Sequence, residues 1–348
     1  MNIDKDIVLV VDYHSKNLSI RWFDSATGEE RTLSRPTEVQ AIQEVVAEAR
    51  SVAMARGGRV VWIMESTTGW SRVKDLIGNQ VVFLLANVLQ IPLPPKAHRR
   101  KTDKLDTKRL LREYLNGDLP LATQPNAWWR RLRRLVGIRE DLVSRRTAVR
   151  NWIRCYFAHE SWADGDNLWS GRGMKRLKKF AAAAEDTDRF VLDKKIRELE
   201  ALAVEVLEVE EQLQAIYDSC PAAQRLSVIK GINVVSSVSI VARIGPIERF
   251  VEPEQLIAYA GLAPGVRQSD ATSRNLSIGG GGTDVQLRHY LIEASLWARD
   301  IPRYRPTYER AMQRRGKKVG RIVVARLLLR SIHKMLRDEV AFTPSMAA

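Results

Sequence analysis

The stretch IVLVVD, residues 7–12, is an apolar and β-branched run that ends in a carboxylate. Such a run is typical of a strand that is buried on both faces and carries its last residue, Asp12, to the edge of a sheet. The run VVWIME, residues 60–65, repeats the pattern and ends in Glu65. The two stretches predict central strands of an α/β domain, each with an acid at its end.

The segments around these runs predict the other elements of the same domain. A half-buried strand is expected at 18–23 and a third strand near 32–33, and the apolar spacing of 38–56 predicts an amphipathic helix. A short helix at 70–77 and a strand at 81–85 follow. Three strands in a meander, then helix, strand, helix and strand, is the order of an RNase H-like α/β domain, in which the first and fourth strands are neighbours.

The stretch KTDKLDTKR, residues 101–109, adds two carboxylates three residues apart in a basic segment. A helix that begins here would put both on one face, although an N-cap with an exposed, salt-bridged turn is the alternative. Carboxylates that converge from separate elements can hold one or two magnesium ions beside a phosphate, whereas a single strand-end acid is more often a turn residue. The acids expected to form this site are Asp12, Glu65, Asp103 and Asp106.

The totals indicate a polyanionic partner. The 348 residues carry a formal net charge of +15, and the sequence pI is about 10.0. Nucleic acid is the first interpretation of such an excess, with an anionic membrane the weaker one. The amino terminus has no signal-peptide pattern and no apolar stretch approaches the roughly 20 residues that span a bilayer, so a cytoplasmic protein without membrane contact is expected.

Segment 128–154 holds nine Arg and two acids among apolar residues at helical spacing. This composition predicts a helix that lies along phosphates, with a solvated basic face as the alternative. A second basic cluster opens the carboxyl-terminal tail. The basic residues expected to contact nucleic acid are Arg99, Arg100, Lys101, Lys104, Arg130, Arg131, Arg133, Arg134, Arg145, Arg146, Arg150, Lys317 and Lys318.

The second half of the chain predicts mainly helices. Segment 192–218 carries an apolar heptad seam with a net charge of −5, which is expected to join helices or subunits. Segment 226–244 predicts helix, glycine turn and helix, either a helix-hairpin-helix element or a plain helical hairpin. A polar loop is expected after QLIAYAGL at 255–262, followed by helices at 284–298 and around 322–329.

On these motifs the chain resembles the insertion-sequence 110 family of transposases, which are related to the Piv and MooV DNA invertases and are RNA-guided recombinases. The resemblance rests on KTDKLDTKRL in the amino half and on IKGI, QLIAYAGLAP and RGKKVGRIVVARLLLRSIHKML in the carboxyl half. It implies a RuvC-like domain of the RNase H fold at 1–125, a basic helix and coiled-coil region at 126–220, and a mostly α transposase domain at 221–348.

The resemblance also implies a serine nucleophile in the loop after AGLAP, where Ser269 occupies the family position. Family members commonly have glycine after this serine, and this chain has Asp270; it also has four glycines at 279–282 where relatives carry a Ser-Lys-Arg-Gly type run. Ser273 and Ser277 lie close enough to be rival nucleophiles.

The implied activity is DNA transposition, in which DNA is cut and rejoined through the serine with Mg²⁺ held by the Asp-Glu-Asp-Asp set. The implied partners are DNA, a guide (bridge) RNA, and further copies of the chain in a dimer or tetramer. Two other functions fit the residues: a metal-only nuclease of the Holliday-junction type, and an inactive nucleic-acid-binding or assembly protein.

Overall fold

The computed structural model describes residues 4–91, 103–157, 167–269, 272–279 and 283–343. For 89, 103–106, 264–269 and 272–278 it describes the backbone alone. The chain divides into two compact units, Met1–Gln124 and Pro125–Ala348. Each unit is described by itself below.

The first unit is built on a mixed five-stranded sheet in the order β3-β2-β1-β4-β5. The first three strands form an antiparallel meander, and β4 and β5 add to β1 in parallel. The strands β1 and β4 are apolar and buried because they lie at the centre of the sheet with both faces covered. The five strands are β1 (Ile7–Tyr13), β2 (Asn17–Asp24), β3 (Glu30–Pro36), β4 (Val60–Glu65) and β5 (Val82–Ala86).

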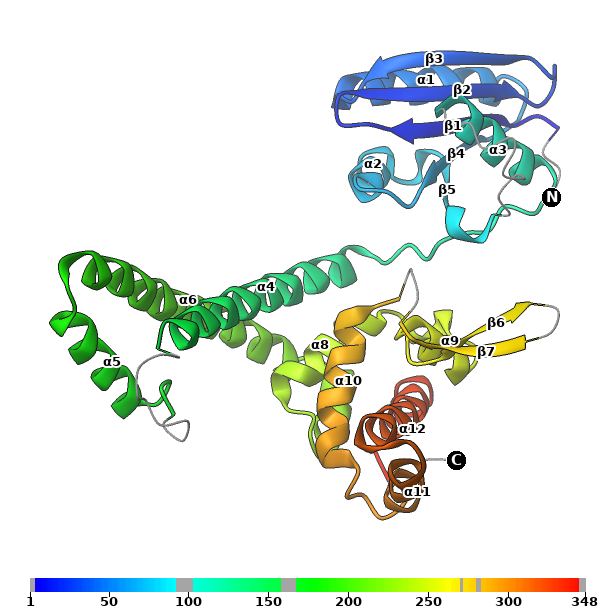
Figure 1. Ribbon diagram of the computed structural model, residues 1–348. Helices are drawn as coiled ribbons and strands as arrows, with labels where there is room; N and C mark the ends of the chain where they lie inside the picture. The colour runs from blue at the N-terminus through cyan, green and yellow to red at the C-terminus, as the bar shows by residue number, and fades with distance from the viewer. Residues whose placement is uncertain (1–3, 92–102, 158–166, 270–271, 280–282, 344–348) are drawn as a thin grey trace. The chain divides into compact units, whose positions relative to one another are not determined.

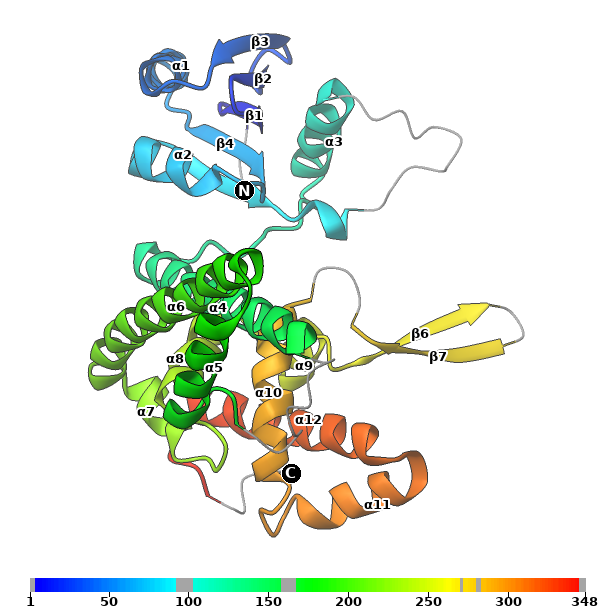
Figure 2. The same ribbon diagram turned by 60° about the vertical axis from the view of Figure 1, so that its left-hand side comes forward.

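Helices cover the two faces of this sheet (Figures 1 and 2). One face packs on α1 through alternate strand residues such as Leu9 and Trp62, with α2 beside α1. The other face packs on α3, where Leu110 and Leu111 meet Val8 and Ile63. The helices are α1 (Val39–Met54), α2 (Trp70–Ile77) and α3 (Asp103–Leu115).

The predicted order of strands and helices in this unit is confirmed. Strands β1 and β4 are hydrogen-bonded neighbours, as the meander-helix-strand pattern predicted. The boundaries differ by up to three residues, because helix ends and strand ends depend on pairing that a local pattern does not record. The predicted strand at 81–85, for example, is paired over Val82–Ala86.

The second unit begins with two long helices that pack along each other, α4 (Ala127–Tyr156) and α6 (Asp186–Asp218). The heptad seam of α6 faces α4 in the same chain, with Leu192, Leu199 and Val206 in their shared core. The seam thus joins two helices of one chain. Figure 1 shows a third helix, α5 (Gly171–Ala183), at the far end of this pair.

The rest of the second unit is mainly helical and surrounds one apolar core. Helix α7 and helix α8 are joined through a turn at Gly231, whose φ of 96° suits glycine, and Asn233 caps α8. The expected helix, turn and helix are therefore present, although the first helix begins at Pro221. The helices are α7 (Pro221–Ser227), α8 (Val234–Ile244), α9 (Pro253–Tyr259), α10 (Val285–Ala298), α11 (Arg305–Arg315) and α12 (Lys317–Arg337).

The polar loop expected after residue 262 is a β-hairpin, which corrects that prediction. Strand β6 (Pro264–Ser269) pairs antiparallel with β7 (Thr272–Ile278), and Ser269 faces Thr272 next to the turn. The segment is polar on alternating positions and lacks an apolar face, so its strand character comes from backbone pairing. The hairpin projects from the helices in both views (Figures 1 and 2).

Within the part of the chain that the structure describes, no helix combines the length and apolar character that a membrane crossing requires.

Candidate active site

Two of the expected carboxylates, Asp12 and Glu65, lie side by side at the edge of the sheet. Val11 of β1 pairs with Met64 of β4, and the next residue on each parallel strand is the acid. Side chains at the same register on parallel strands point to the same face. The sheet therefore brings together two carboxylates that are 53 positions apart in the sequence.

Both acids lie on the face that packs on α3. Along β1 the residues Val8 and Val10 contact this helix, and Asp12 is the next residue of the same alternation. Along β4 the alternation runs from Val61 through Ile63 to Glu65 in the same way. Figure 2 shows α3 alone on its side of the sheet.

Helix α3 runs so that its first turn approaches the acidic edge. Arg21 of β2 donates from Nε to Thr107 Oγ1 at 3.2 Å, beside the middle of β1. Tyr114, near the other end of α3, interacts electrostatically with Asp6, which precedes β1. Burial raises the pKa of Tyr114, and the charge of Asp6 raises it further. The helix is thus antiparallel to β1, and its amino-terminal turn lies toward Asp12.

Asp103 and Asp106 are in this first turn. Their side chains lie outside the description, so the structure gives the backbone position of these two expected ligands and nothing of their carboxylates. Among the described residues no three His, Cys, Asp or Glu side chains are grouped closely enough to hold a metal ion. The donor chemistry nevertheless suits magnesium, which prefers carboxylate oxygens.

His14, which is not one of the four expected metal ligands, lies beside one of these acids. His14 Nε2 lies 3.3 Å from Asp12 Oδ2. Only Tyr13, the last residue of β1, separates the two residues in the sequence. The signal was present in the sequence, because a residue two positions after a strand-end acid shares its side of the chain. His14 can orient Asp12 or exchange a proton near it.

The second candidate site is the hairpin that bears Ser269, and its base is closed by Asp284. The backbone N–H of Asp284 donates to the Tyr259 carbonyl at 2.8 Å, and Gly279 N–H donates to the Gly261 carbonyl at 3.0 Å. Asp284 Oδ1 also accepts from Leu287 N–H at 2.9 Å and so caps α10. These contacts hold the end of α9 and the start of α10 together below the hairpin.

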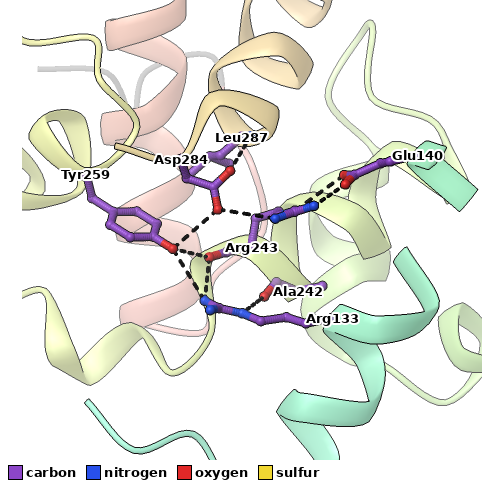
Figure 3. Close-up of polar contacts among 7 residues, drawn as sticks. All are labelled: Arg133, Glu140, Ala242, Arg243, Tyr259, Asp284 and Leu287. Atoms are coloured by element: carbon purple, nitrogen blue, oxygen red, sulfur yellow. Dashed lines mark hydrogen bonds and ion pairs between the residues drawn. The ribbon is translucent and has the colours of Figure 1, made fainter. Parts of the chain in front are cut away.

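Arg243 ties this base to two other helices (Figure 3). Its guanidinium pairs with Glu140 of α4 and lies 3.7 Å from Asp284 Oδ2. The two carboxylates are only 9% and 10% exposed. Burial lowers the pKa of Arg243, but the charges and hydrogen bond of these acids outweigh burial and hold it above its usual value. The Tyr259 hydroxyl can donate to the Arg243 carbonyl, 3.2 Å away, or to Asp284 Oδ2, 3.3 Å away.

Arg133, expected to contact nucleic acid, has a structural role in this network. Its Nε donates to the Ala242 carbonyl at 2.9 Å and its Nη2 to the Arg243 carbonyl at 2.8 Å. These are carbonyls of the last turn of α8, which have no partner within their own helix. The residues Arg133, Arg243, Tyr259 and Asp284 are called the hairpin clamp below.

The other basic residues expected to contact nucleic acid differ in exposure and in their partners. Arg131, Arg134, Lys317 and Lys318 are exposed. Arg130 donates to the Pro125 carbonyl at 2.9 Å, and Arg145 pairs with Asp141 at 2.7 Å. The members outside the described side chains are Arg99, Arg100, Lys101 and Lys104.

Comparison with known proteins finds similarity to transposases. Residues 223–309 match the family model described as "Transposase IS116/IS110/IS902 family", a region that holds the hairpin and most of the hairpin clamp. The chain is 23% identical over 270 residues to "Putative transposase y4qE" of Sinorhizobium fredii (strain NBRC 101917 / NGR234), covering 76% of this chain and 65% of that protein. It is 26% identical over 209 residues to "Transposase for insertion sequence element IS1111A" of Coxiella burnetii (strain RSA 493 / Nine Mile phase I), covering 58% of this chain and 56% of that protein.

The matches thus span less than two thirds of either relative's own length. Both relatives and the matched family model are described as transposases. Over residues 223–309 the chain is therefore similar to the IS116/IS110/IS902 family of transposases, and over more than half of its length it resembles two transposases.

Proposed function

We propose that this protein is a DNA transposase that cuts and rejoins DNA with two catalytic parts. The first part is an RNase H-like, RuvC-like domain at 1–125. The second is the transposase domain at 221–348, preceded by the basic helix and coiled-coil region at 126–220. The strand order β3-β2-β1-β4-β5 and its covering helices support the RNase H-like assignment.

The observation that carries the proposal is the pair Asp12 and Glu65 on neighbouring parallel strands, below the helix that begins with Asp103. Two carboxylates at one sheet edge repel each other, and a cation bound between them would relieve that repulsion. These two acids, with Asp103 and Asp106, are the residues that would hold Mg²⁺. When bound, magnesium would neutralise charge on the phosphoryl oxygens and on the leaving oxygen.

Ser269 is the proposed nucleophile. Its Oγ attacks the scissile phosphorus, the Oγ–P bond forms, and the bond from phosphorus to one bridging oxygen breaks. The serine proton leaves to a nearby base, and the departing oxygen takes up a proton. A hydroxyl of the joining DNA end then attacks the phosphoserine, forms the new phosphodiester and returns the proton to Ser269. The position of Ser269 beside the hairpin turn, away from the helical core, supports access to a strand of DNA.

The proposed partners are DNA and a guide RNA, bound by an assembly of at least two copies of the chain. A guide that pairs with DNA leaves the protein to recognise backbone and shape. The exposed cations Arg131, Arg134, Lys317 and Lys318 suit phosphate contacts of this kind. These partners follow from the family, and the net charge of +15 supports them.

The experiment is a comparison of Ser269→Ala with Ser273→Ala and Ser277→Ala in the full chain. Each variant is incubated with Mg²⁺, DNA carrying the element ends, and the RNA that co-purifies with the protein. We expect Ser269→Ala alone to lose the covalent protein–DNA adduct and strand joining. Normal cleavage by Ser269→Ala would contradict the serine route and indicate a metal-only nuclease.

A further inference from the structure

The far end of the α4–α6 pair carries an arginine stripe. Arg146, Arg150 and Arg154 follow one another at intervals of four along α4, so their side chains share one face of the helix. No ion pair links any of the three to an acid among the described residues. Like charges at this spacing destabilise a helix, so the stripe is costly unless something else uses it.

Trp169 holds two of these arginines in place. The guanidinium carbons of Arg150 and Arg154 lie 5.1 Å and 5.4 Å from the centre of its indole ring. Cation–π contact of this kind orders a guanidinium without neutralising its charge. Burial and the charges of Arg146 and Arg154 lower the pKa of Arg150, and Arg150 Nε has no hydrogen-bond partner among the described residues.

Helix α5 continues the positive surface. Its apolar side, with Leu177 and Ala181, packs into the core shared with α4 and α6. The opposite side carries Arg172, Lys175 and Lys179 at helical spacing, and all three are exposed. The helix has no acidic residue in its 13 positions.

Two pairs of adjacent cations show that, among the described residues, only some cations of this region form ion pairs with acids. Arg145 is neutralised by Asp141 at 2.7 Å, whereas the adjacent Arg146 is part of the stripe. Lys178 is neutralised by Glu200 at 2.5 Å, whereas the adjacent Lys179 lies on the outer side of α5. A merely solvated basic surface gives no reason for its cations to line up where the described residues place no acid beside them.

We propose that this arm surface, formed by the α4 stripe, Trp169 and the outer side of α5, binds the phosphodiester backbone of a double-stranded nucleic acid. Arginine suits this ligand through its bidentate geometry and its weaker hydration, and a row of cations at regular spacing can follow a row of phosphates. The inference rests on the proposed function in one respect, namely that the partner is a nucleic acid. It assigns a role to Trp169 and α5, which the sequence did not mark as a binding surface.

The test measures binding in the full chain carrying Ser269→Ala, so that turnover has no part in the result. Arg146→Gln is compared with Arg145→Gln, and Lys179→Gln with Lys178→Gln, on a DNA duplex and on a double-stranded RNA of equal length. Fluorescence anisotropy at several salt concentrations gives Kd and its salt dependence.

We expect Arg146→Gln and Lys179→Gln to weaken binding roughly threefold or more and to reduce the slope of log Kd against log salt by about one each, because each loses a phosphate contact. The matched variants at the neutralised positions should change little. Loss on the DNA alone, on the RNA alone or on both supports the proposal and names the nucleic acid. Equal effects of Arg146→Gln and Arg145→Gln on both ligands, together with equal effects of the two lysine variants, would overturn it.

Thermal unfolding of the same proteins provides the check on folding. Removal of Arg146 relieves repulsion along α4, so its variant should be at least as stable as the parent. Weaker binding by a protein of unchanged stability therefore reports on the arm surface and not on the fold.

Discussion

Arg21 of β2 donates a hydrogen bond to Thr107 of α3 at 3.2 Å, within the interface that holds the helix on the acidic face of the sheet. Arg21 is buried, and burial lowers its pKa. It also pairs with Glu30 of β3. The position of α3, and with it the first turn that bears Asp103 and Asp106, thus depends on a polar contact between the sheet and the helix.

Thr107→Val keeps the shape of this side chain and removes its hydroxyl. We expect the variant to lower the free energy of unfolding by about 1–2 kcal/mol, because a buried donor on Arg21 loses an acceptor. Urea denaturation measures the change. Thr107→Ser keeps the hydroxyl and is the control; if Val and Ser variants are equally stable, the contact does not contribute to the packing of α3.

Asp12→Asn and Glu65→Gln test the acidic edge. Each should reduce Mg²⁺-dependent DNA cleavage by ~100-fold or more, because a carboxylate ligand is lost. Glu44→Gln on the exposed side of α1 is the matched control. Cleavage at the parental rate by Asp12→Asn would remove this edge from the mechanism.

Arg243→Met tests the hairpin clamp. The substitution leaves Glu140 and Asp284 without their shared cation while both are almost buried, and we expect a loss of about 2–3 kcal/mol in the free energy of unfolding. The double variant Arg243→Met with Glu140→Gln should recover part of this loss, because one uncompensated charge is gone. A double-mutant cycle measures the coupling. Independent, additive effects would contradict the network.

Asp24 gives the expected response to acid. Burial by itself raises the pKa of this carboxyl, but hydrogen bonds from Arg56 and from the backbone of Ala26 and Thr27 outweigh burial and hold the pKa below its usual value. The unfolded chain therefore binds this proton more readily than the folded protein does. The resulting stability is fully present above the unfolded pKa of about 4 and is lost as the pH falls through the lower folded pKa.

Asp24→Asn should accordingly be less stable than the parent at neutral pH, and the difference should shrink below about pH 4. Urea unfolding between neutral and strongly acid pH measures this. Glu205→Gln, at an exposed position on α6, should give a difference that hardly depends on pH. A constant deficit for Asp24→Asn at every pH would show that its contribution is packing and not charge.

The amino-terminal fold was predictable because its information is local. Residues 7–11 and 60–64 are apolar at every position, as central parallel strands must be, and the acids that follow them mark the edge of the sheet. From this pattern the adjacency of Asp12 and Glu65 could be inferred before any coordinates. The interaction of His14 with Asp12 is equally local, because the two residues are two positions apart.

The second unit was less predictable because its decisive contacts are long-range. Arg133 was expected to contact phosphate like its neighbours, and only its approach to carbonyls more than 100 positions away assigns it to the end of α8. The hairpin around Ser269 has no apolar alternation to mark it as strand. The seam of α6 predicted a partner helix, but no local pattern could say that α4 of the same chain would fill it.

Because hydrogen bonds close the base of the hairpin, a change of conformation at its tip should not alter the stability of the helices below. Ala260 and Leu262 are fully buried in the core, so the frame includes them, but the insert between Leu262 and Asp284 can be lengthened, shortened or replaced without disturbing it. Asp270 and the run of glycines at 279–282 both fall inside this exchangeable insert. A hairpin transplanted from a relative between Leu262 and Asp284 should therefore fold on this scaffold, which offers a direct route to testing the proposed role of the hairpin.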